Sequence, residues 1–316
     1  MRTIAGSASI GAPLTRPILT IGNFDGIHLG HRAILDTVIE RARTLRGEAV
    51  VYTFDPHPRK VISPQSAPRL LTTIEQKLEL LAAAGVDAVI VERFDAAFAR
   101  TAPDVFIREF VHTRIRPLEV YVGYDFHFGR DREGSMRMLT ELGPRLGFSV
   151  TIIPEVVMGD GDVNSTRIRE LLAKGRVEEA SLLLGRDYTV RGQVVPGDAR
   201  GRTLGFPTAN LASENEVLPE AGVYAGWLHC LDAGDPPAGA KLPAVSNVGT
   251  RPTFGASDHV VVEAHLIDFS GDLYGRRVEL SFRFYLRPER RFAGVEALRA
   301  QIEVDRTEAR RRLAAG

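Results

Sequence analysis

The sequence predicts two parts of different architecture: an α/β domain with a parallel sheet covered by helices, then a small closed antiparallel barrel with a terminal helix. Three observations lead to this prediction. Apolar runs alternate with amphipathic helical segments over residues 17–184, as in a parallel sheet. From residue 188, strand-like segments follow one another between Gly, Pro and Asp clusters. The length, 316 residues, is that of about two ordinary domains.

In the first part, five apolar runs are expected to form strands and three amphipathic segments to form helices. The strands are 17–24, 48–54, 87–94, 118–123 and 148–154. The helices are 30–46, 74–85 and 103–113, with Gly47 and Gly85 placed to end the first two and Pro103 near the first turn of the third. Because parallel sheets bind ligands beyond the carboxyl ends of their strands, the loops after these strands are the expected site.

In the second part, strands dominate. They are expected at 188–195, 222–231, 243–249, 259–269 and 277–287, and no helical pattern intervenes until 295–314. This pattern favours a small antiparallel barrel on which the last helix packs. We therefore expect two domains, residues 1–186 and 187–316.

The composition argues against several classes of protein. Lys plus Arg and Asp plus Glu number 40 each, so net charge gives no argument for nucleic acid as a partner. The single cysteine, Cys230, excludes an intrachain disulfide and a Cys-rich zinc site. No long apolar run and no cationic leader occur, so we expect a soluble cytoplasmic protein without a membrane segment. The sequence does not determine whether the chain forms a homo-oligomer.

The stretch TIGNFDGIHLGHRAIL, residues 20–35, places His28 and His31 where a strand leads into a helix. Gly22 and Gly26 let the backbone turn tightly and approach a ligand. A helix N-terminus is a natural phosphate site, and imidazoles there can donate to phosphate oxygens. Residue types alone leave two alternatives open: structural histidines, or a metal site to which Asp25 adds a ligand.

This stretch resembles the HxGH signature of the nucleotidylyltransferase superfamily, whose histidines steady the phosphates of a nucleoside triphosphate. The resemblance implies a Rossmann-like domain. The loop residues that it places at the nucleotide are Gly22, Asn23, Phe24, Asp25 and Gly26.

A second segment, NSTRIRELL (164–172), resembles the later Ser/Thr-Arg signature of the same superfamily. Ser165 and Thr166 can cap a helix and donate to phosphate, and Arg167 offers five donors for triphosphate charge. A plain helix cap with surface arginines is the alternative. The two segments in this order are much harder to obtain by chance than either one.

Two further segments, TFDPHP (53–58) and VGYDFHFGR (122–130), follow predicted strands. With the two signatures, they closely resemble the adenylyltransferase module of bacterial bifunctional riboflavin kinase/FAD synthetases. That resemblance implies transfer of AMP from ATP to FMN, giving FAD and pyrophosphate, with Asp125 at the nucleotide. The residues expected near the flavin are Phe54, Pro56, Phe126 and Phe128. Core packing is the alternative for the phenylalanines, and Tyr124 departs from the small polar or acidic residue usual in the family.

The most informative stretch of the second part is GDARGRTLGFPTANL, residues 197–211. Gly201 and Gly205 can line phosphates with backbone N–H groups. Thr208 and Asn210 offer hard oxygen donors for Mg²⁺ or phosphate. The stretch is no Walker A loop, because the G-K-[ST] ending is missing. On chemistry alone, a Gly-rich hairpin is an equal alternative.

The same stretch resembles the PTAN signature of riboflavin kinases, which form a six-stranded antiparallel barrel, and NVGTRPTFG (247–255) and VEAHLIDFSGDLYGRRV (262–278) match that family as well. The resemblance implies transfer of a phosphoryl group from ATP to riboflavin, with Glu263 as the base. Period-two alternation puts Glu263 on the strand face opposite Val262 and Ala264. The alternative is a Glu263 that faces solvent or pairs with an arginine. YLRPERRF (285–292) resembles a segment near the flavin, which implicates Arg287.

The leading hypothesis is therefore an enzyme with two activities, riboflavin to FMN and FMN to FAD, that uses ATP with Mg²⁺. The first alternative keeps only the kinase, with an N-terminal domain that binds nucleotide but turns over poorly. A second alternative is a non-catalytic regulator that binds flavin or nucleotide. The third, a histidine-based metal protein, predicts a bound transition metal.

Overall fold

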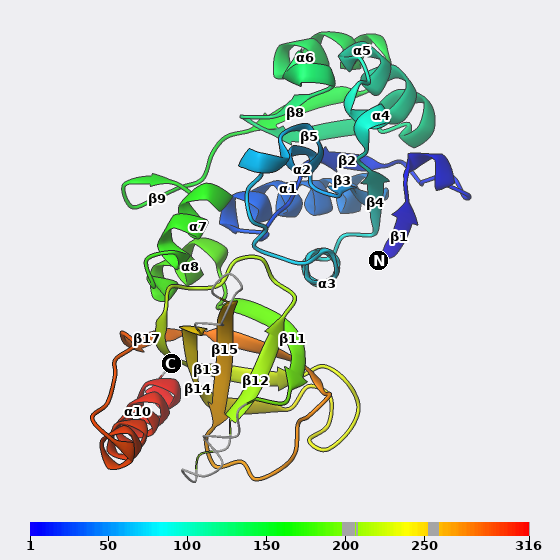
Figure 1. Cartoon of the computed structure of the whole chain (residues 1–316). Coiled ribbons are helices and arrows are strands. Elements are labelled where there is room, and N and C mark those ends of the chain that lie inside the picture. The colour runs from blue at the N-terminus through cyan, green and yellow to red at the C-terminus, as the bar shows by residue number, and fades with distance from the viewer. Residues whose placement is uncertain (198–205, 207, 252–258, 316) are drawn as a thin grey trace. The chain divides into compact units, whose positions relative to one another are not determined.

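The computed structural model describes residues 1–197, 206, 208–251 and 259–315 (Figure 1). Contacts within the chain divide it into two compact units, Met1–Ser165 and Thr166–Gly316. The domain ranges expected from the sequence, 1–186 and 187–316, stay a prediction.

The first unit is built on a parallel sheet, as predicted, and this sheet has six strands where five were expected. The strands are β1 (Arg2–Ala5), β2 (Ile18–Ile21), β3 (Ala49–Asp55), β4 (Ala88–Arg93), β5 (Glu119–Gly123) and β8 (Ser149–Ile153). Five of them fall on the five predicted runs. The sequence analysis missed β1, which pairs with β4 at the sheet edge and carries only one half-buried side chain, Ile4.

The strand order, β1-β4-β3-β2-β5-β8, puts β2 beside both β3 and β5. The chain leaves β2 for β3 and β4 on one side and later returns to β5 and β8 on the other (Figure 1). The carboxyl ends of β2 and β5 therefore meet where the strand order reverses, which is where open α/β sheets bind ligands. The loops that begin at residues 22 and 124 start at this point.

Helices cover both faces of the sheet (Figure 1). The longer ones are α1 (Leu29–Leu45), α3 (Ile74–Ala84), the π-helix η3 (Phe106–Ile115) and α6 (Met136–Arg145). Side chains of α1 and α3 form one core with Ile18, Val51 and Val89, while η3 and α6 form another with Leu19 and Val50. Neighbouring positions along one strand thus serve opposite cores, which explains the continuous apolar runs.

Short elements complete this unit. They are η1 (Ser7–Ser9), α2 (Pro58–Ile62), η2 (Pro64–Ser66), α4 (Ala96–Ala99), α5 (Pro103–Val105), η4 (Arg130–Arg132), the β6–β7 hairpin (His127–Phe128, Gly134–Ser135) and the β9–β10 hairpin (Val157–Met158, Gly161–Asp162). The helix predicted at 103–113 forms, with Pro103 in its first turn, but from Phe106 it is wound as a π-helix. The spacing of apolar residues in the sequence does not distinguish a π-helix from an α-helix.

The helix ends follow local rules, with one difference from expectation. Gly85 ends α3 in the left-handed conformation, as predicted, and Thr73 with Gln76 forms a capping box at its start. At the end of α1, the left-handed residue is Arg46 and not Gly47. Gly47 is required for a different reason: a Cβ there would lie 2.2 Å from the Arg16 carbonyl oxygen.

The second unit contains the predicted barrel (Figure 1). Its elements are α8 (Val177–Leu184), β11 (Tyr188–Val195), β12 (Thr208–Ser213), β13 (Gly222–Cys230), β14 (Lys241–Arg251), β15 (His259–Leu266), β16 (Arg277–Phe282), β17 (Phe284–Arg287) and α10 (Val295–Ala315). Strands β11 to β16 close into an antiparallel ring through the β13–β14 pairing, and β17 adds to β13. The helix α7 (Ser165–Leu172) spans the boundary between the units.

The two faces of the barrel wall are separated by register. Gly222, Val248, Val262, Leu211 and Val194 pair in sequence across five strands and are all buried, which marks the inner face. The neighbouring residues Val223 and Val245 pack instead with Ala309 and Leu313 of α10. The terminal helix therefore covers part of the outer face, as the sequence predicted for a helix packed on the barrel.

In the part of the chain that the structure describes, no helix is both long and apolar enough to span a membrane.

Candidate active sites

The loop after β2 brings the two histidines together at the start of α1. His28 is the N-cap, and its Nδ1 accepts a hydrogen bond from the His31 backbone N–H at 3.3 Å. The two rings stack with centroids 3.7 Å apart. Because Nδ1 accepts, the ring hydrogen of His28 lies on Nε2, and that nitrogen is a donor.

Gly30 is a site residue that the sequence analysis did not single out. A Cβ at this position would lie 3.0 Å from the Val163 carbonyl oxygen and 3.1 Å from the His28 ring. A side chain at this position would therefore press on the His28 ring and on the Val163 carbonyl group, and one of them would have to shift. The signal was present in the sequence, since Gly30 is the glycine of the HxGH pattern itself.

Asp25 holds the loop in place. Its carboxylate accepts the backbone N–H of Leu71 at 3.0 Å, that of Thr72 at 3.2 Å, and the Thr72 hydroxyl. The Gly26 N–H donates to the same Thr72 hydroxyl at 3.3 Å. Asp25 is 4% exposed, so this buried carboxylate is compensated by donors from the chain before α3.

The other predicted loop residues differ in exposure. Asn23 is exposed, and its carbonyl oxygen accepts the Thr53 hydroxyl at 3.3 Å. The Phe24 side chain is buried in the core beneath α1, where its ring lies 5.1 Å from that of His31. Gly22 lies against Phe24, since a Cβ there would be 3.2 Å from its ring. Contact of these residues with a nucleotide stays a prediction.

Ser165 lies at the same loop, because its hydroxyl donates to the Asp25 carbonyl oxygen at 2.9 Å. Thr166 is exposed and Arg167 half-buried, and both belong to the second unit. The structure thus joins Ser165 to the histidine loop, while the role of Thr166 and Arg167 at the triphosphate stays a prediction.

Phe54, near the end of β3, and Phe126 and Phe128, in the segment after β5, belong to one cluster of aromatic side chains. The ring centroids of Phe54 and Phe98 are 6.0 Å apart, and those of Phe98 and Phe106 are 6.2 Å apart. The ring of Phe106 in turn lies 5.6 Å from that of Phe128, centroid to centroid. Phe126 stacks on Phe128 at 5.4 Å. Phe128 and Phe106 belong to the core, with Phe54 and Phe126 packed half-buried against it. These contacts are those of core packing, and flavin contact by Phe54, Phe126 or Phe128 stays a prediction.

Two other predicted residues and one departure from the family lie on these loops. Pro56 and Asp125 are exposed. Burial and the hydrogen bond that Tyr124 donates to Glu155 raise the pKa of the Tyr124 phenol to about 12. Tyr124 is therefore a neutral donor at ordinary pH, next to the Asp125 carboxylate.

Lys77, a residue that sequence reasoning missed, lies one turn into α3 and is 6% exposed. Burial lowers its pKa, while the carboxylates of Asp25 and Asp55 act in the opposite direction. His57 is also buried and caps α2 through the Arg59 N–H at 3.2 Å. No local pattern marks these residues, because their partners are distant in sequence or are backbone atoms.

In the barrel, Thr208, Asn210 and Glu263 gather on the outer face. Asn210 pairs with Glu263 across β12 and β15, and Thr208 pairs with His265. Glu263 also pairs with Asn247 of β14. Asn247 is two residues from Val245 and so lies on the same face of β14, the outer face that α10 covers at Val245. Val262 and Ala264 are buried and Glu263 is half-buried, so the predicted alternation holds. Paired residues share a face, which places Glu263 beside Asn210.

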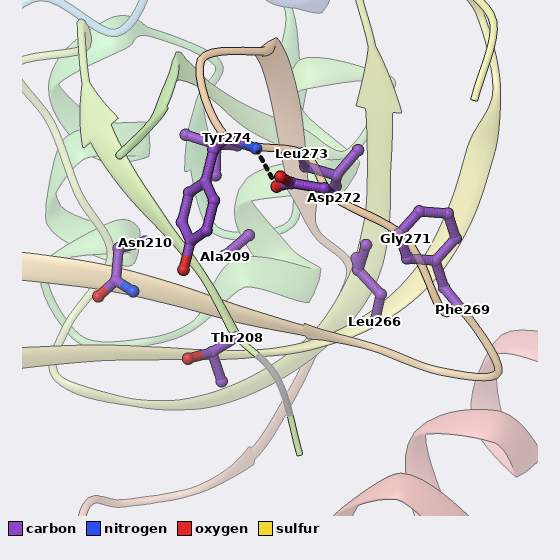
Figure 2. A pocket seen from close by; sticks show the side chains of 10 residues that line it. Thr208, Ala209, Asn210, Leu266, Phe269, Gly271, Asp272, Leu273 and Tyr274 are labelled. Atoms are coloured by element: carbon purple, nitrogen blue, oxygen red, sulfur yellow. Dashed lines mark hydrogen bonds between the residues drawn. The ribbon is translucent and has the colours of Figure 1, made fainter. Parts of the chain in front are cut away.

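A small pocket of about 80 Å³ adjoins these residues (Figure 2). Thr208, Asn210 and Tyr274 line it, together with Asp272, whose carboxylate accepts the Tyr274 backbone N–H at 2.9 Å. Glycine is required at residue 197, because a Cβ there would lie 2.1 Å from Asn210 Nδ2 and would displace the Asn210 side chain. A hydroxyl and an amide oxygen at one pocket suit a hard cation such as Mg²⁺.

Arg287 has a structural partner. Its guanidinium donates to the Asp305 carboxylate of α10 at 2.7 to 3.1 Å, and Asp305 is 5% exposed. Arg287 thereby ties β17 to the terminal helix, and its contact with flavin stays a prediction. Gly201 and Gly205 lie outside the described residues. Among the described residues, no group of three or more His, Cys, Asp or Glu side chains is arranged to hold a metal ion.

Comparison with known proteins identifies the family. Residues 12–167 match the FAD synthetase family model and residues 184–313 match the riboflavin kinase model. The bifunctional riboflavin kinase/FMN adenylyltransferase of Escherichia coli K12 is 40% identical over 311 residues, covering 98% of this chain and 97% of the relative. That of Bacillus subtilis is 33% identical, covering 93% and 92%.

The chain belongs to the family of bifunctional riboflavin kinase/FMN adenylyltransferases. A solved structure shows that the similarity also holds for the fold of the chain. A Streptococcus pneumoniae protein, described as a macrolide-efflux protein, superposes with a TM-score of 0.86 at 29% identity, covering 98% of both chains.

Proposed function

We propose that the chain makes FAD from riboflavin in two steps, phosphorylation of riboflavin to FMN in the barrel and adenylylation of FMN in the α/β unit. The observation that carries the proposal is that each family model matches one half of the chain, on the residues that form each candidate site. The substrates are then ATP, riboflavin and FMN, and the products are FMN and ADP from the first step, FAD and pyrophosphate from the second.

In the α/β unit, an FMN phosphate oxygen attacks the α-phosphorus of ATP, and the bond to pyrophosphate breaks. His28 Nδ1 is engaged in the helix cap, and the His31 ring stacks on the His28 ring. Donors fixed in this way stabilise the charge that develops on the phosphates without having to reorganise. Ser165, bonded to the same loop, supports a second contact with the triphosphate.

In the barrel, the 5′-hydroxyl of riboflavin attacks the γ-phosphorus of ATP, ADP leaves, and Glu263 accepts the hydroxyl proton. Thr208 and Asn210 would hold Mg²⁺ through neutral oxygens, and the ion would neutralise phosphate charge. Glu263 lies on the strand next to Asn210, so base and phosphate ligands come from neighbouring strands.

The cytoplasmic location expected from the sequence stays a prediction.

The proposal is tested on the full chain with ATP, Mg²⁺ and either riboflavin or FMN, with separation of the flavins and measurement of pyrophosphate. We expect FMN and then FAD from riboflavin, and FAD with equimolar pyrophosphate from FMN. FMN formation without any FAD would support the kinase-only alternative. Flavin binding without turnover would support a regulator, and a stoichiometric transition metal in the purified protein would support the metal hypothesis.

A single substitution tests the base. Glu263→Gln keeps the size of the side chain but replaces one carboxylate oxygen with an NH2 group, which removes its capacity to take a proton. We expect FMN formation to fall by at least about 100-fold, while FAD formation from supplied FMN is kept. Unchanged FMN formation would rule out Glu263 as the base.

A further inference from the structure

Phe206, just ahead of the proposed kinase residue Thr208, is enclosed by two other elements of the barrel unit. Its ring is 5% exposed. The edge of His265, on β15, meets the ring at a centroid distance of 5.4 Å and an interplanar angle of 86°. On α10, the Arg306 guanidinium carbon lies 5.7 Å from the ring centroid. Phe206 is therefore held between the barrel wall and the terminal helix.

The terminal helix reaches this point because it covers the adjoining part of the barrel wall. Val245, which packs with Ala309 of α10, pairs with His265, and His265 pairs with Thr208. Paired side chains share one face of the barrel wall. Val245, His265 and Thr208 therefore form one row across β14, β15 and β12, which begins at the contact with α10 and ends at the proposed kinase residue. Arg306 lies one turn before Ala309 on the helix.

Arg306 is itself fixed on several sides. One of its terminal nitrogens lies 3.6 Å from Asp268 and the other 2.8 Å from Glu303. Its Nε is buried without a hydrogen-bond partner among the described residues. A guanidinium with a desolvated edge next to an aromatic ring gains more from a cation–π contact than one in water.

We propose that Arg306 is a positioning residue for the kinase reaction: it holds the Phe206 ring against the barrel and so fixes the chain that leads to Thr208. The inference rests on the proposed kinase site at Thr208 and Asn210. Arg306 acts through Phe206 and touches no substrate. Riboflavin affinity should therefore be kept, while the turnover that depends on the placed phosphate groups should fall.

The test uses Arg306→Gln in the full chain, with Arg310→Gln as the matched control. Arg310 binds the same Asp268 carboxylate at 2.7 Å, but its side chain is 55% exposed, and Arg306 is the α10 arginine placed over Phe206. We expect kcat for FMN formation to fall about tenfold in Arg306→Gln, with riboflavin affinity and FAD formation from FMN unchanged. Arg310→Gln should keep the kinase rate, and Arg306→Lys should recover part of it.

Two further variants keep the test decisive. Phe206→Leu should show the same fall in kcat with Arg306 intact, and combining it with Arg306→Gln should add little. Full kinase activity in both single variants, or an equal fall in Arg310→Gln, would overturn the inference. Thr208→Ala tests the proposed kinase site separately from the role of Arg306. If this variant too retains full kinase activity, the proposed site is wrong and the inference about Arg306 falls with it.

Discussion

His28 presents two ring nitrogens with different tasks. Nδ1 caps α1 by accepting the His31 N–H, and Nε2 is the nitrogen that we propose donates to a phosphate. An asparagine at this position can still cap, because its side-chain oxygen accepts the same N–H, but it offers no donor where Nε2 lies. The two tasks can therefore be separated by substitution.

We expect His28→Asn to lower FAD formation from FMN by about 100-fold or more with little change in the melting temperature. His28→Ala should lose the same activity and in addition about 1 kcal/mol of stability from the missing cap. Steady-state assays and thermal melts measure the two effects. An asparagine variant with normal FAD formation would mean that capping is all that His28 does.

Tyr124 allows a prediction about pH. Its pKa is raised from the ordinary value of 10.0 to about 12, so the folded chain holds this proton more tightly than the unfolded chain. The resulting stabilisation is complete below pH 10 and is lost as the pH rises through 12. Tyr124→Phe should be less stable than the parent near pH 8, and the difference in denaturation midpoint should shrink near pH 11. A difference that does not depend on pH would contradict the raised pKa.

The turn between β2 and α1 that carries His28 could be predicted from the sequence, because two glycines follow an apolar run and precede an amphipathic segment, while contact of His28 with phosphate stays a prediction. Thr72 could not, since it meets Asp25 from 47 positions along the chain and looks like any residue before a helix. Lys77 reads as the polar side of an amphipathic helix, yet it is buried. Such contacts depend on which loops the sheet order brings together.

At the scale of elements, a buried ion pair ties α10 to β17, in addition to the apolar contacts of the helix with the barrel. Asp305 is 5% exposed and accepts from Arg287 and from Gln301, at 2.7 Å. Replacing Arg287 leaves that carboxylate charged, buried and short of its cation. The cost of breaking such a pair from one side exceeds that of replacing both partners.

We therefore expect Arg287→Leu to lower the free energy of unfolding of the barrel by about 3 kcal/mol, and Arg287→Leu with Asp305→Leu to recover much of it. Trp227, the single tryptophan of the chain, lies on β13 and reports barrel unfolding in urea by fluorescence. A double variant less stable than Arg287→Leu would contradict this account. Loss of riboflavin affinity in both variants would support the flavin contact predicted for Arg287.

Elements with a strong pattern were predicted well, and the misses have physical causes. β1 lies at a sheet edge and is mostly exposed, so it has no apolar run to recognise. β12 is missing from the expected strands because TANLAS is short and follows a Gly/Pro-rich stretch, although its pairing with β11 and β15 is needed to close the barrel. Both strands form through their neighbours more than through their own composition.

At the scale of the molecule, the proposed base and metal ligands of one reaction and the two histidines of the other lie in separate units. Glu263, Thr208 and Asn210 lie in the second unit, and His28 and His31 lie in the first. A substitution at one site should then leave the chemistry of the other intact. Mixing two single-site variants tests this and also asks whether FMN has to leave the molecule between the two steps.

Glu263→Gln should keep FAD formation from FMN, and His28→Asn should keep FMN formation from riboflavin. We expect an equimolar mixture, given riboflavin, ATP and Mg²⁺, to form FAD, because FMN released by one molecule can bind to the other. The lag before FAD appears should shorten as the protein concentration rises, since transfer through solution is bimolecular. If FMN forms only in an amount equal to that of His28→Asn and no FAD appears, although Glu263→Gln converts added FMN, then FMN stays bound to the molecule that made it, and transfer within one chain must replace diffusion.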